Sequence, residues 1–206
     1  MDLANNIHNI RVEGAKKLSS LIMQTLGFLD MPKVMFEIDV KKNESNGKTI
    51  LTQYGIDDVE FMVATNPGES LAPMNKIASG GELSRIMLAL KSAVSDKNGA
   101  QTVIFDEIDT GVSGSTSQKL GIKLHDISKS TQTICVTHSA QIAALADSHF
   151  FIKKVEVDNR AEAHVSLLNK EQRINEIARI IGGIDLTENQ MVAAEELINQ
   201  SELFLR

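Results

Sequence analysis

The first 30 residues carry apolar side chains at mostly helical spacing. The apolar positions and the residues that end the pattern are Leu3, Ile7, Ile10, Leu18, Leu21, Ile22, Leu26, Gly27 and Pro32. Glycine and a following proline are common just past the end of a helix. The pattern therefore predicts one long N-terminal helix. An ordinary packing helix and the end of a coiled-coil arm fit this pattern equally well.

Alternation with a period of two replaces the helical pattern in the next segment. Val34–Val40 and Ile50–Tyr54 alternate apolar and polar residues, and Val59–Val63 reads as a third strand. The dipeptide Asn46-Gly47, between the first two segments, is a strong signal for a two-residue hairpin turn. The sequence therefore predicts a small antiparallel sheet in which the first two segments pair.

The tripeptide Gly47-Lys48-Thr49 at this turn imitates the end of a phosphate-binding P-loop. A P-loop needs another glycine about five residues before Gly47, and that position holds Lys42. The segment also precedes a strand, whereas a P-loop precedes a helix. We therefore assign it to the turn.

A capped helix is predicted to begin at Ser79. Ser79 and Glu82 have the spacing of a capping box, and apolar residues then recur at helical spacing at Leu83, Ile86, Met87, Leu90 and Val94. Gly80 and Gly81, in the first turn, each cost roughly 1 kcal/mol relative to alanine in a helix interior. They leave backbone N–H groups uncovered at a helix N-terminus, where the dipole favours an anion. We therefore expect phosphate contact here, rather than a core helix alone.

Short apolar runs and helical patterns alternate in the second half of the chain. Val103–Phe105, Thr133–Val136 and Phe150–Ile152 read as buried strands with helical segments between them. This order predicts a parallel sheet with right-handed crossovers. Val165–Leu168 fits an added edge strand. Two helices follow, with apolar positions at Ile174, Ile177, Ile180 and Ile181 in the first, and at Val192, Leu197 and Ile198 in the second, which starts at Thr187.

Two carboxylates and a histidine follow the first two of these strands. Asp106 and Glu107 end the first strand, and His138 follows the second. Ligands of open α/β sheets gather at the carboxyl ends of the strands. Neighbouring strand residues point to opposite faces, so Asp106 can hold Mg²⁺ through water while Glu107 orients the attacking water. The alternatives are a solvated acidic turn for the pair and a structural role for His138.

Composition limits the partners of this chain. Its 206 residues, 42% hydrophobic and 23% charged, suit one globular domain. A net charge of -6 and a pI of about 5.4 argue against a broad nucleic-acid-binding surface, which needs clustered Lys and Arg. The single cysteine, Cys135, lies in an apolar run and is expected in the core. A single cysteine fits a reducing, cytoplasmic setting. The sequence shows no apolar run of membrane length and no signal-peptide pattern, so no membrane partner is expected.

Several of these segments resemble motifs of ABC-type ATPases. Ser79–Ser84 is similar to their signature motif, Thr102–Glu107 to their Walker B strand, the segment from Asp109 to their D-loop, and Thr137-His138 to their H-loop. A closer resemblance is to the C-terminal part of the RecN family of bacterial SMC-like ATPases. The segments that carry this resemblance are Ala64–Glu69, Ile77–Lys91, Asp106–Gly114 and Thr137–Ala143.

The resemblance implies an α/β fold, the C-terminal lobe of a P-loop NTPase-like ABC/SMC ATPase head. A parallel sheet flanked by helices would be joined by a small antiparallel sheet and an N-terminal coiled-coil helix. Residues 1–30 would form the end of a coiled-coil arm, and residues 31–206 the C-terminal lobe. The Walker A lysine would lie in an N-terminal lobe of the same protein, so the fragment alone is expected to be inactive.

The resemblance also implies ATP and Mg²⁺ as cofactors and a homodimer as the working state. The residues that it assigns are Glu107 and His138 for catalysis, Asp106 for Mg²⁺ through water, Asp109, Thr110 and Gly111 for the D-loop, and Ser79, Gly80, Gly81 and Glu82 for contact with ATP on the opposite head. The full-length protein would bind DNA at the nucleoid during double-strand break repair and recombination. Another SMC-like or ABC-type ATPase, or a non-catalytic module for dimerisation or DNA tethering, is the alternative.

Overall fold

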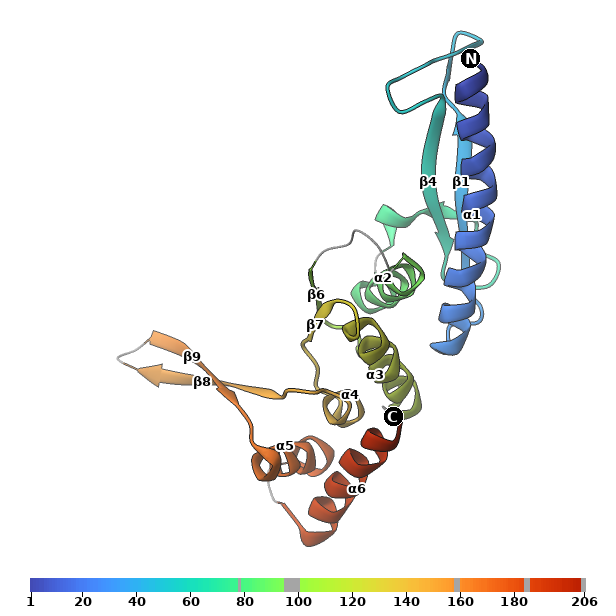
Figure 1. The fold of residues 1–206 in the computed structure, drawn as a ribbon. Helices are drawn as coiled ribbons and strands as arrows, with labels where there is room; N and C mark the ends of the chain where they lie inside the picture. The colour runs from blue at the N-terminus through green and yellow to red at the C-terminus, as the bar shows by residue number, and fades with distance from the viewer. Residues whose placement is uncertain (78, 95–100, 158–159, 184–185, 205–206) are drawn as a thin grey trace. The chain divides into compact units, whose positions relative to one another are not determined.

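A long helix beside an antiparallel sheet forms the first of the two units into which the chain divides, Met1–Gly99 (Figure 1). In this unit α1 (Asp2–Phe28) lies along β1 (Met35–Lys42) and also packs against α2 (Gly80–Val94). The predicted N-terminal helix is therefore confirmed. The computed structural model describes every residue except 78, 95–100, 158–159, 184–185 and 205–206.

The sheet of the first unit has the strand order β1-β4-β5. β4 (Asp57–Ala64) pairs with the whole of β1 in antiparallel register, from Met35 opposite Ala64 to Lys42 opposite Asp57. β5 (Ala72–Pro73) pairs with the other edge of β4 and leads into a short 3-10 helix. The small antiparallel sheet is therefore confirmed.

The predicted pairing of the first strand with residues 50–54 is wrong. Within that segment the structure places only one isolated bridge, between Thr52 and Gly55, and Tyr54 is 74% exposed. β4 instead brings Phe61 against Phe36 of β1, with their ring centroids 5.9 Å apart. The pairing that buries aromatic and aliphatic side chains is favoured over the pairing with the shorter connection.

The hairpin turn is where the sequence predicts it, although its strands are short. β2 (Glu44–Ser45) pairs with β3 (Lys48–Thr49) in antiparallel fashion. Asn46 and Gly47 between them have φ angles of 51° and 72°, and two positive values are characteristic of the hairpin turn that this dipeptide favours. Lys48 and Thr49 therefore lie in a strand, not at the start of a helix as in a P-loop.

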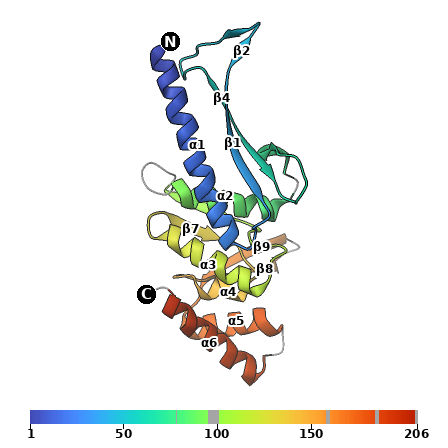
Figure 2. The same ribbon diagram turned by 90° about the vertical axis from the view of Figure 1, so that its right-hand side faces the viewer.

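One apolar core joins α1, α2 and the sheet of the first unit. Its buried members are Ile22, Leu26, Val34, Phe36, Ile38, Val63, Ile86 and Ala89. Figure 2 shows α1 beside β1 and β4 in a second view. Full burial of one such aliphatic side chain stabilises the folded state by about 1.5–3 kcal/mol. The C-terminal half of α1 is therefore held mainly by apolar packing.

The N-terminal half of α1 is held by a buried carboxylate. The side chain of Asp57, at the start of β4, has no exposed surface. Its Oδ1 lies 2.6 Å from His8 Nδ1, and its Oδ2 accepts a hydrogen bond of 2.8 Å from Arg11 Nη1. Arg11 also donates to the carbonyl of Tyr54. Burial raises the pKa of Asp57, but the hydrogen bonds from Arg11 and His8 outweigh burial and bring the pKa below its ordinary value.

Two short parallel strands begin the second unit, Ala100–Arg206. β6 (Thr102–Phe105) pairs with β7 (Gln132–Cys135), and α3 (Gly114–Ser128) connects them, as the alternating pattern predicts. The prediction that both strands are buried is wrong in part. Ile104 and Ile134 are 66% and 45% exposed, because alternate residues of a strand face opposite sides and the described part of this unit does not cover both.

The prediction of a third parallel strand is wrong. β8 (Phe150–Val157) pairs in antiparallel fashion with β9 (Arg160–Leu167), and the pairing starts with Phe150 opposite Leu167. The expected edge strand at 165–168 is thus the end of β9. An antiparallel partner that follows directly in sequence needs only a short connection, whereas a parallel partner needs a crossover.

Three helices pack together in the remainder of the second unit: α4 (Ala140–Ala144), α5 (Lys170–Gly182) and α6 (Glu188–Phe204). The buried residues of the apolar cluster that they share are Ala140, Ala143, Ala144, Ile177, Ala178, Ala194 and Ile198. Asn169 and Gln172 form a capping box at the start of α5. The two predicted C-terminal helices are confirmed. Among the helices that the structure describes, none has the length and apolar character of a membrane span.

We expect Asp57→Asn to lower the free energy of unfolding by about 1–3 kcal/mol near neutral pH, because asparagine keeps the volume but not the charge that pairs with Arg11 and His8. The folded-state pKa of Asp57 lies below its unfolded value of about 3.9, so its stabilisation is present above that value and is lost as the pH falls through the folded value. Urea unfolding near pH 7 and near pH 3 measures both effects.

The neighbouring Asp58→Asn is the matched control, because Asp58 is exposed and its loss should change stability by less than about 0.5 kcal/mol. The difference between wild type and Asp57→Asn should shrink in acid. A difference that stays constant down to about pH 3 would show that the charge of Asp57 is not what stabilises the unit.

Candidate functional site

The two parallel strands end side by side, and the predicted catalytic residues follow them. Phe105 lies opposite Cys135 in the register, and the N–H of Val136 donates to the carbonyl of Phe105 at 2.9 Å. Asp106 and Glu107 continue from β6, and His138 lies three residues after the end of β7. The structure therefore brings these three residues to the same edge of the sheet, as expected for the carboxyl ends of parallel strands.

Glu107 has a left-handed backbone. Its φ angle is 57°, in a region that costs about 1–2 kcal/mol for a residue with a Cβ atom. Its side chain is exposed, whereas the next residue, Ile108, is fully buried. Strained residues of this kind cluster at active sites, where the surrounding structure holds them in place. The turn after β6 thus directs the Glu107 carboxylate outward while Ile108 anchors the chain.

Asp109 points into the protein, unlike its neighbours in the predicted D-loop. The residue is 4% exposed, whereas Thr110 and Gly111 are exposed. Its Oδ2 accepts hydrogen bonds from Thr137 Oγ1 at 2.5 Å and from the backbone N–H of His138 at 3.0 Å. Asp109 therefore ties the loop after β6 to the loop after β7.

His138 has one ring nitrogen against this carboxylate. Its Nδ1 lies 3.3 Å from Asp109 Oδ2, yet 79% of its side-chain surface is exposed. The N–H of Ser139 donates to Thr137 Oγ1 at 3.0 Å, and α4 begins at the next residue. The ring is therefore anchored at one side and open to a ligand at the other.

Cys135, at the end of β7, carries a partly buried thiol. Burial, followed by the negative charges of Asp109 and Asp106, raises its pKa to about 12. The thiol therefore stays protonated near neutral pH, and a protonated thiol is neither a good nucleophile nor a metal ligand. The expectation of a structural cysteine is consistent with this environment.

The segment that resembles the ABC signature belongs to the first unit. Ser79 Oγ accepts a hydrogen bond of 3.4 Å from the N–H of Glu82, and the carbonyl of Ser79 accepts from the N–H of Leu83 at 3.0 Å. The predicted helix start is therefore confirmed. Ser79 and Gly80 are exposed and Gly81 is buried. The first turn of α2 is thus exposed at Ser79 and Gly80.

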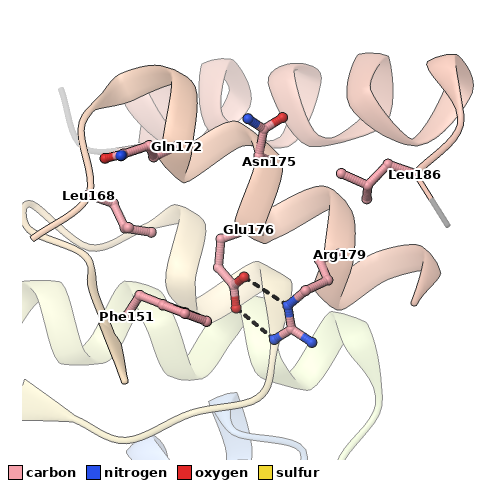
Figure 3. A pocket seen from close by; sticks show the side chains of 7 residues that line it. All are labelled: Phe151, Leu168, Gln172, Asn175, Glu176, Arg179 and Leu186. Atoms are coloured by element: carbon pink, nitrogen blue, oxygen red, sulfur yellow. Dashed lines mark hydrogen bonds and ion pairs between the residues drawn. The ribbon is translucent and has the colours of Figure 1, made fainter. Parts of the chain in front are cut away.

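A shallow pocket of about 260 Å³ lies elsewhere in the second unit, beside α5 (Figure 3). Its lining residues are Phe151, Leu168, Gln172, Asn175, Glu176, Arg179 and Leu186. Glu176 accepts two hydrogen bonds from the guanidinium of Arg179, at 2.7 and 2.8 Å. None of the predicted site residues lines this pocket. This pocket is therefore separate from the candidate site.

Comparison with curated proteins gives a consistent set of relatives. The chain is 44% identical over 191 residues to the DNA repair protein RecN of Halalkalibacterium halodurans. The match covers 93% of this chain and 34% of that protein. It is 42% identical to RecN of Bacillus subtilis, with 97% of this chain and 36% of that protein covered. It is 40% identical to RecN of Vibrio cholerae, and the match covers 95% of this chain and 34% of that protein.

The chain belongs to the RecN family. It spans about a third of the length of the RecN proteins that it matches. A comparison with protein-family models gave no match.

Solved structures similar to this RecN-family chain are SMC head domains. One is the Smc head of Pyrococcus yayanosii with a coiled coil and joint (TM-score 0.54, 19% identity, 82% of this chain and 29% of that chain). Another is the Smc head of Pyrococcus furiosus, bound to the C-terminal domain of ScpA. It has a TM-score of 0.54 and 19% identity, and the match covers 87% of this chain and 42% of that chain. A third comes from work on ATP-driven dimerization and DNA-stimulated activation of SMC ATPases. It has a TM-score of 0.50 and 19% identity, and the match covers 86% of this chain and 99% of that chain. The predicted SMC head fold is therefore confirmed.

The contact between Asp109 and His138 is the feature of this RecN-family site that sequence reasoning missed. The sequence indicates Thr137 only as part of a Thr-His pair. In the structure its hydroxyl donates to Asp109 and accepts from the N–H of Ser139. One sequence signal could have indicated the contact: the apolar Ile108 lies between two acidic residues, so the chain must turn inward there. The direction of the Asp109 side chain required the structure.

The left-handed backbone of Glu107 can be tested with two substitutions that both remove its carboxylate. We expect Glu107→Gly to be more stable than Glu107→Ala by about 0.5–1 kcal/mol, because only glycine adopts this conformation without steric cost. Urea unfolding of the two variants gives the difference.

The same pair of substitutions at Asp126, an exposed residue of α3, is the control. At this position the glycine variant should have a free energy of unfolding roughly 1 kcal/mol lower than the alanine variant, as in any exposed helix interior. The same order of stability at both positions would contradict the conformation assigned to Glu107.

Proposed function

We propose that this chain is the C-terminal lobe of the ATPase head of a RecN-type protein that acts in DNA double-strand break repair and recombination. The relatives it matches are named DNA repair proteins, and its fold is that of SMC heads. The observation that carries the proposal is the placement of Asp106, Glu107 and His138 at one edge of a parallel sheet. The protein would work in the cytoplasm, at the nucleoid.

Three residues would handle the nucleotide at this edge. ATP would supply the phosphoryl group, and Mg²⁺ would neutralise its charge. Asp106 would hold Mg²⁺ through water, Glu107 would orient or deprotonate the attacking water, and His138 would contact the γ-phosphate. The described residues contain no group of three metal-ligating side chains. This fits Mg²⁺, which often binds through one carboxylate together with waters and substrate phosphates.

The signature segment would serve the opposite head of a homodimer. The exposed Ser79 and Gly80 lie at the N-terminus of α2, together with Gly81 and Glu82. Backbone N–H groups at such a position favour a phosphate. Asp109, Thr110 and Gly111 would form the D-loop, and the full-length protein would bind DNA.

A second lobe would complete the nucleotide site. The sequence has no P-loop, and the nearest imitation, at Gly47, forms a β-turn. Apolar side chains of β6 and β7 are exposed, as are Phe150 and Leu167 of the β8–β9 hairpin. Parallel sheets are normally covered on both faces. These exposed positions support an N-terminal lobe that carries Walker A and covers this sheet, without which the chain would be inactive.

The role of Glu107 predicts the behaviour of Glu107→Gln in the full-length protein. We expect turnover to fall by about 10²–10⁴-fold while ATP binding is retained, because the amide keeps the shape but cannot accept a proton. The ATP-bound dimer should also last longer, because hydrolysis would normally release it. Steady-state ATPase rates and size-exclusion chromatography with ATP measure both effects. Near-normal turnover would remove Glu107 from this role.

The division of the site between lobes predicts the result of a mixing experiment. This chain alone should not hydrolyse ATP, and adding a separately produced N-terminal lobe should restore hydrolysis. Ser79→Arg should abolish the restored activity, because the long side chain covers the first turn of α2, while leaving the lobes associated. Hydrolysis by the chain alone at a rate sensitive to Glu107→Gln would contradict the proposal, since a complete site would then lie within these residues.

A further inference from the structure

We propose that Asp109 is a positioning residue that fixes the orientation and tautomer of His138. The inference rests on the proposed ATPase function, in which His138 meets the nucleotide. The resemblance assigns Asp109 to the D-loop without indicating where its side chain points. In the structure only 1% of the Asp109 side-chain surface is exposed, and the carboxylate faces the loop after β7.

One oxygen of Asp109 gathers donors from two consecutive residues. Oδ2 accepts from Thr137 Oγ1 at 2.5 Å and from the backbone N–H of His138 at 3.0 Å, and it lies 3.3 Å from His138 Nδ1. The first two contacts fix the backbone on which the imidazole is carried. The third is an approach at ion-pair distance that draws Nδ1 of the ring toward the carboxylate. Together they leave the ring less freedom than its 79% exposed surface suggests.

The chemistry of the two groups sets the position of the ring proton. An ionised carboxylate can only accept hydrogen bonds, so its approach to Nδ1 at 3.3 Å favours hydrogen on that nitrogen. In the neutral ring Nε2 is then an acceptor, and it is the nitrogen available to a ligand at the sheet edge. Carboxylates orient histidine in this way in hydrolytic triads and in metal sites.

The surroundings of Asp109 favour this role over a purely structural one. Its second oxygen, Oδ1, is buried and has no hydrogen-bond partner among the described residues. Such an acceptor normally costs stability, so a residue needed only for packing would not be expected to keep a carboxylate here. Asp109 also lies two positions after Glu107. One side chain thus connects the segment of the water-orienting carboxylate with the segment of the histidine.

Packing between the helices that follow the two loops limits how far they can separate. α3 follows the loop of Asp109, and α4 begins just after His138. At their contact, a Cβ atom on Gly121 of α3 would lie 2.5 Å from Leu145 Cδ1 and 3.4 Å from the backbone of Ile142. The close approach of α3 to α4 therefore holds the Asp109 and His138 segments together, and the carboxylate needs to fix only the side chain and its proton.

The test is Asp109→Asn, in which the amide oxygen can still accept from Thr137 and His138 but the charge is lost. In nitrogen-15 NMR spectra of the 206-residue chain, we expect His138 of the wild type to be the Nδ1–H tautomer, with the other four histidines as internal references. The variant should lose this preference. In the full-length protein, kcat should fall about 10- to 100-fold while the KM for ATP changes less than about twofold.

Asp126→Asn, on the exposed surface of α3, is the matched control and should change neither the spectrum nor kcat. Thermal unfolding of the chain shows whether Asp109→Asn remains folded. Thr137→Val removes one donor to the same oxygen but leaves the charge of Asp109, so it should keep the Nδ1–H tautomer and separates loss of the charge from loss of a hydrogen bond. An Nε2–H tautomer in the wild type would overturn the proposal, as would an unchanged tautomer in folded Asp109→Asn. Because the spectra do not depend on hydrolysis, they decide the role of Asp109 even if the full-length protein proves not to be an ATPase.

Discussion

The parallel pairing of β6 with β7 is the interaction on which the candidate site depends. With Phe105 opposite Cys135, the chain leaves both strands at one edge and carries Asp106, Glu107 and His138 to it. A register shift of one residue would reverse the face of every side chain on the shifted strand. The buried carboxylate of Asp109 then joins the two loops beyond the strands. The geometry of the site thus follows from backbone pairing first and from one side chain second.

Most helices and strands could be predicted from the sequence, but the strand partners could not. Alternation of apolar and polar residues indicates which face of a strand is buried, without indicating which strand lies beside it. For this reason the pairing expected for Ile50–Tyr54 is replaced by β4, and the segment from Phe150 pairs with β9 instead of extending the parallel sheet. The Asn46-Gly47 turn was predictable because its backbone conformation depends on those two residues themselves.

The candidate site also has features that could be predicted from the sequence and features that could not. Its carboxylates and histidine could be predicted because they follow apolar runs, and parallel strands end at a common edge. The left-handed backbone of Glu107 and the inward direction of Asp109 could not, because both depend on the burial of Ile108 and on donors from Thr137, about 30 residues away in sequence. Long-range contacts of this kind leave no local pattern in the sequence.

The attachment of α1 has a mechanical consequence. The helix is fastened at two levels: by the charged contacts of Asp57 with His8 and Arg11, and by the packing of Ile22 and Leu26 in the apolar core. At about 1.5 Å per residue these levels are roughly 16 Å apart along the axis. A rod clamped at two separated points cannot pivot about either one. Within its own unit α1 therefore behaves as a stiff lever, and a torque applied at its N-terminal end is transmitted to the sheet and to α2, whose start resembles the ABC signature motif.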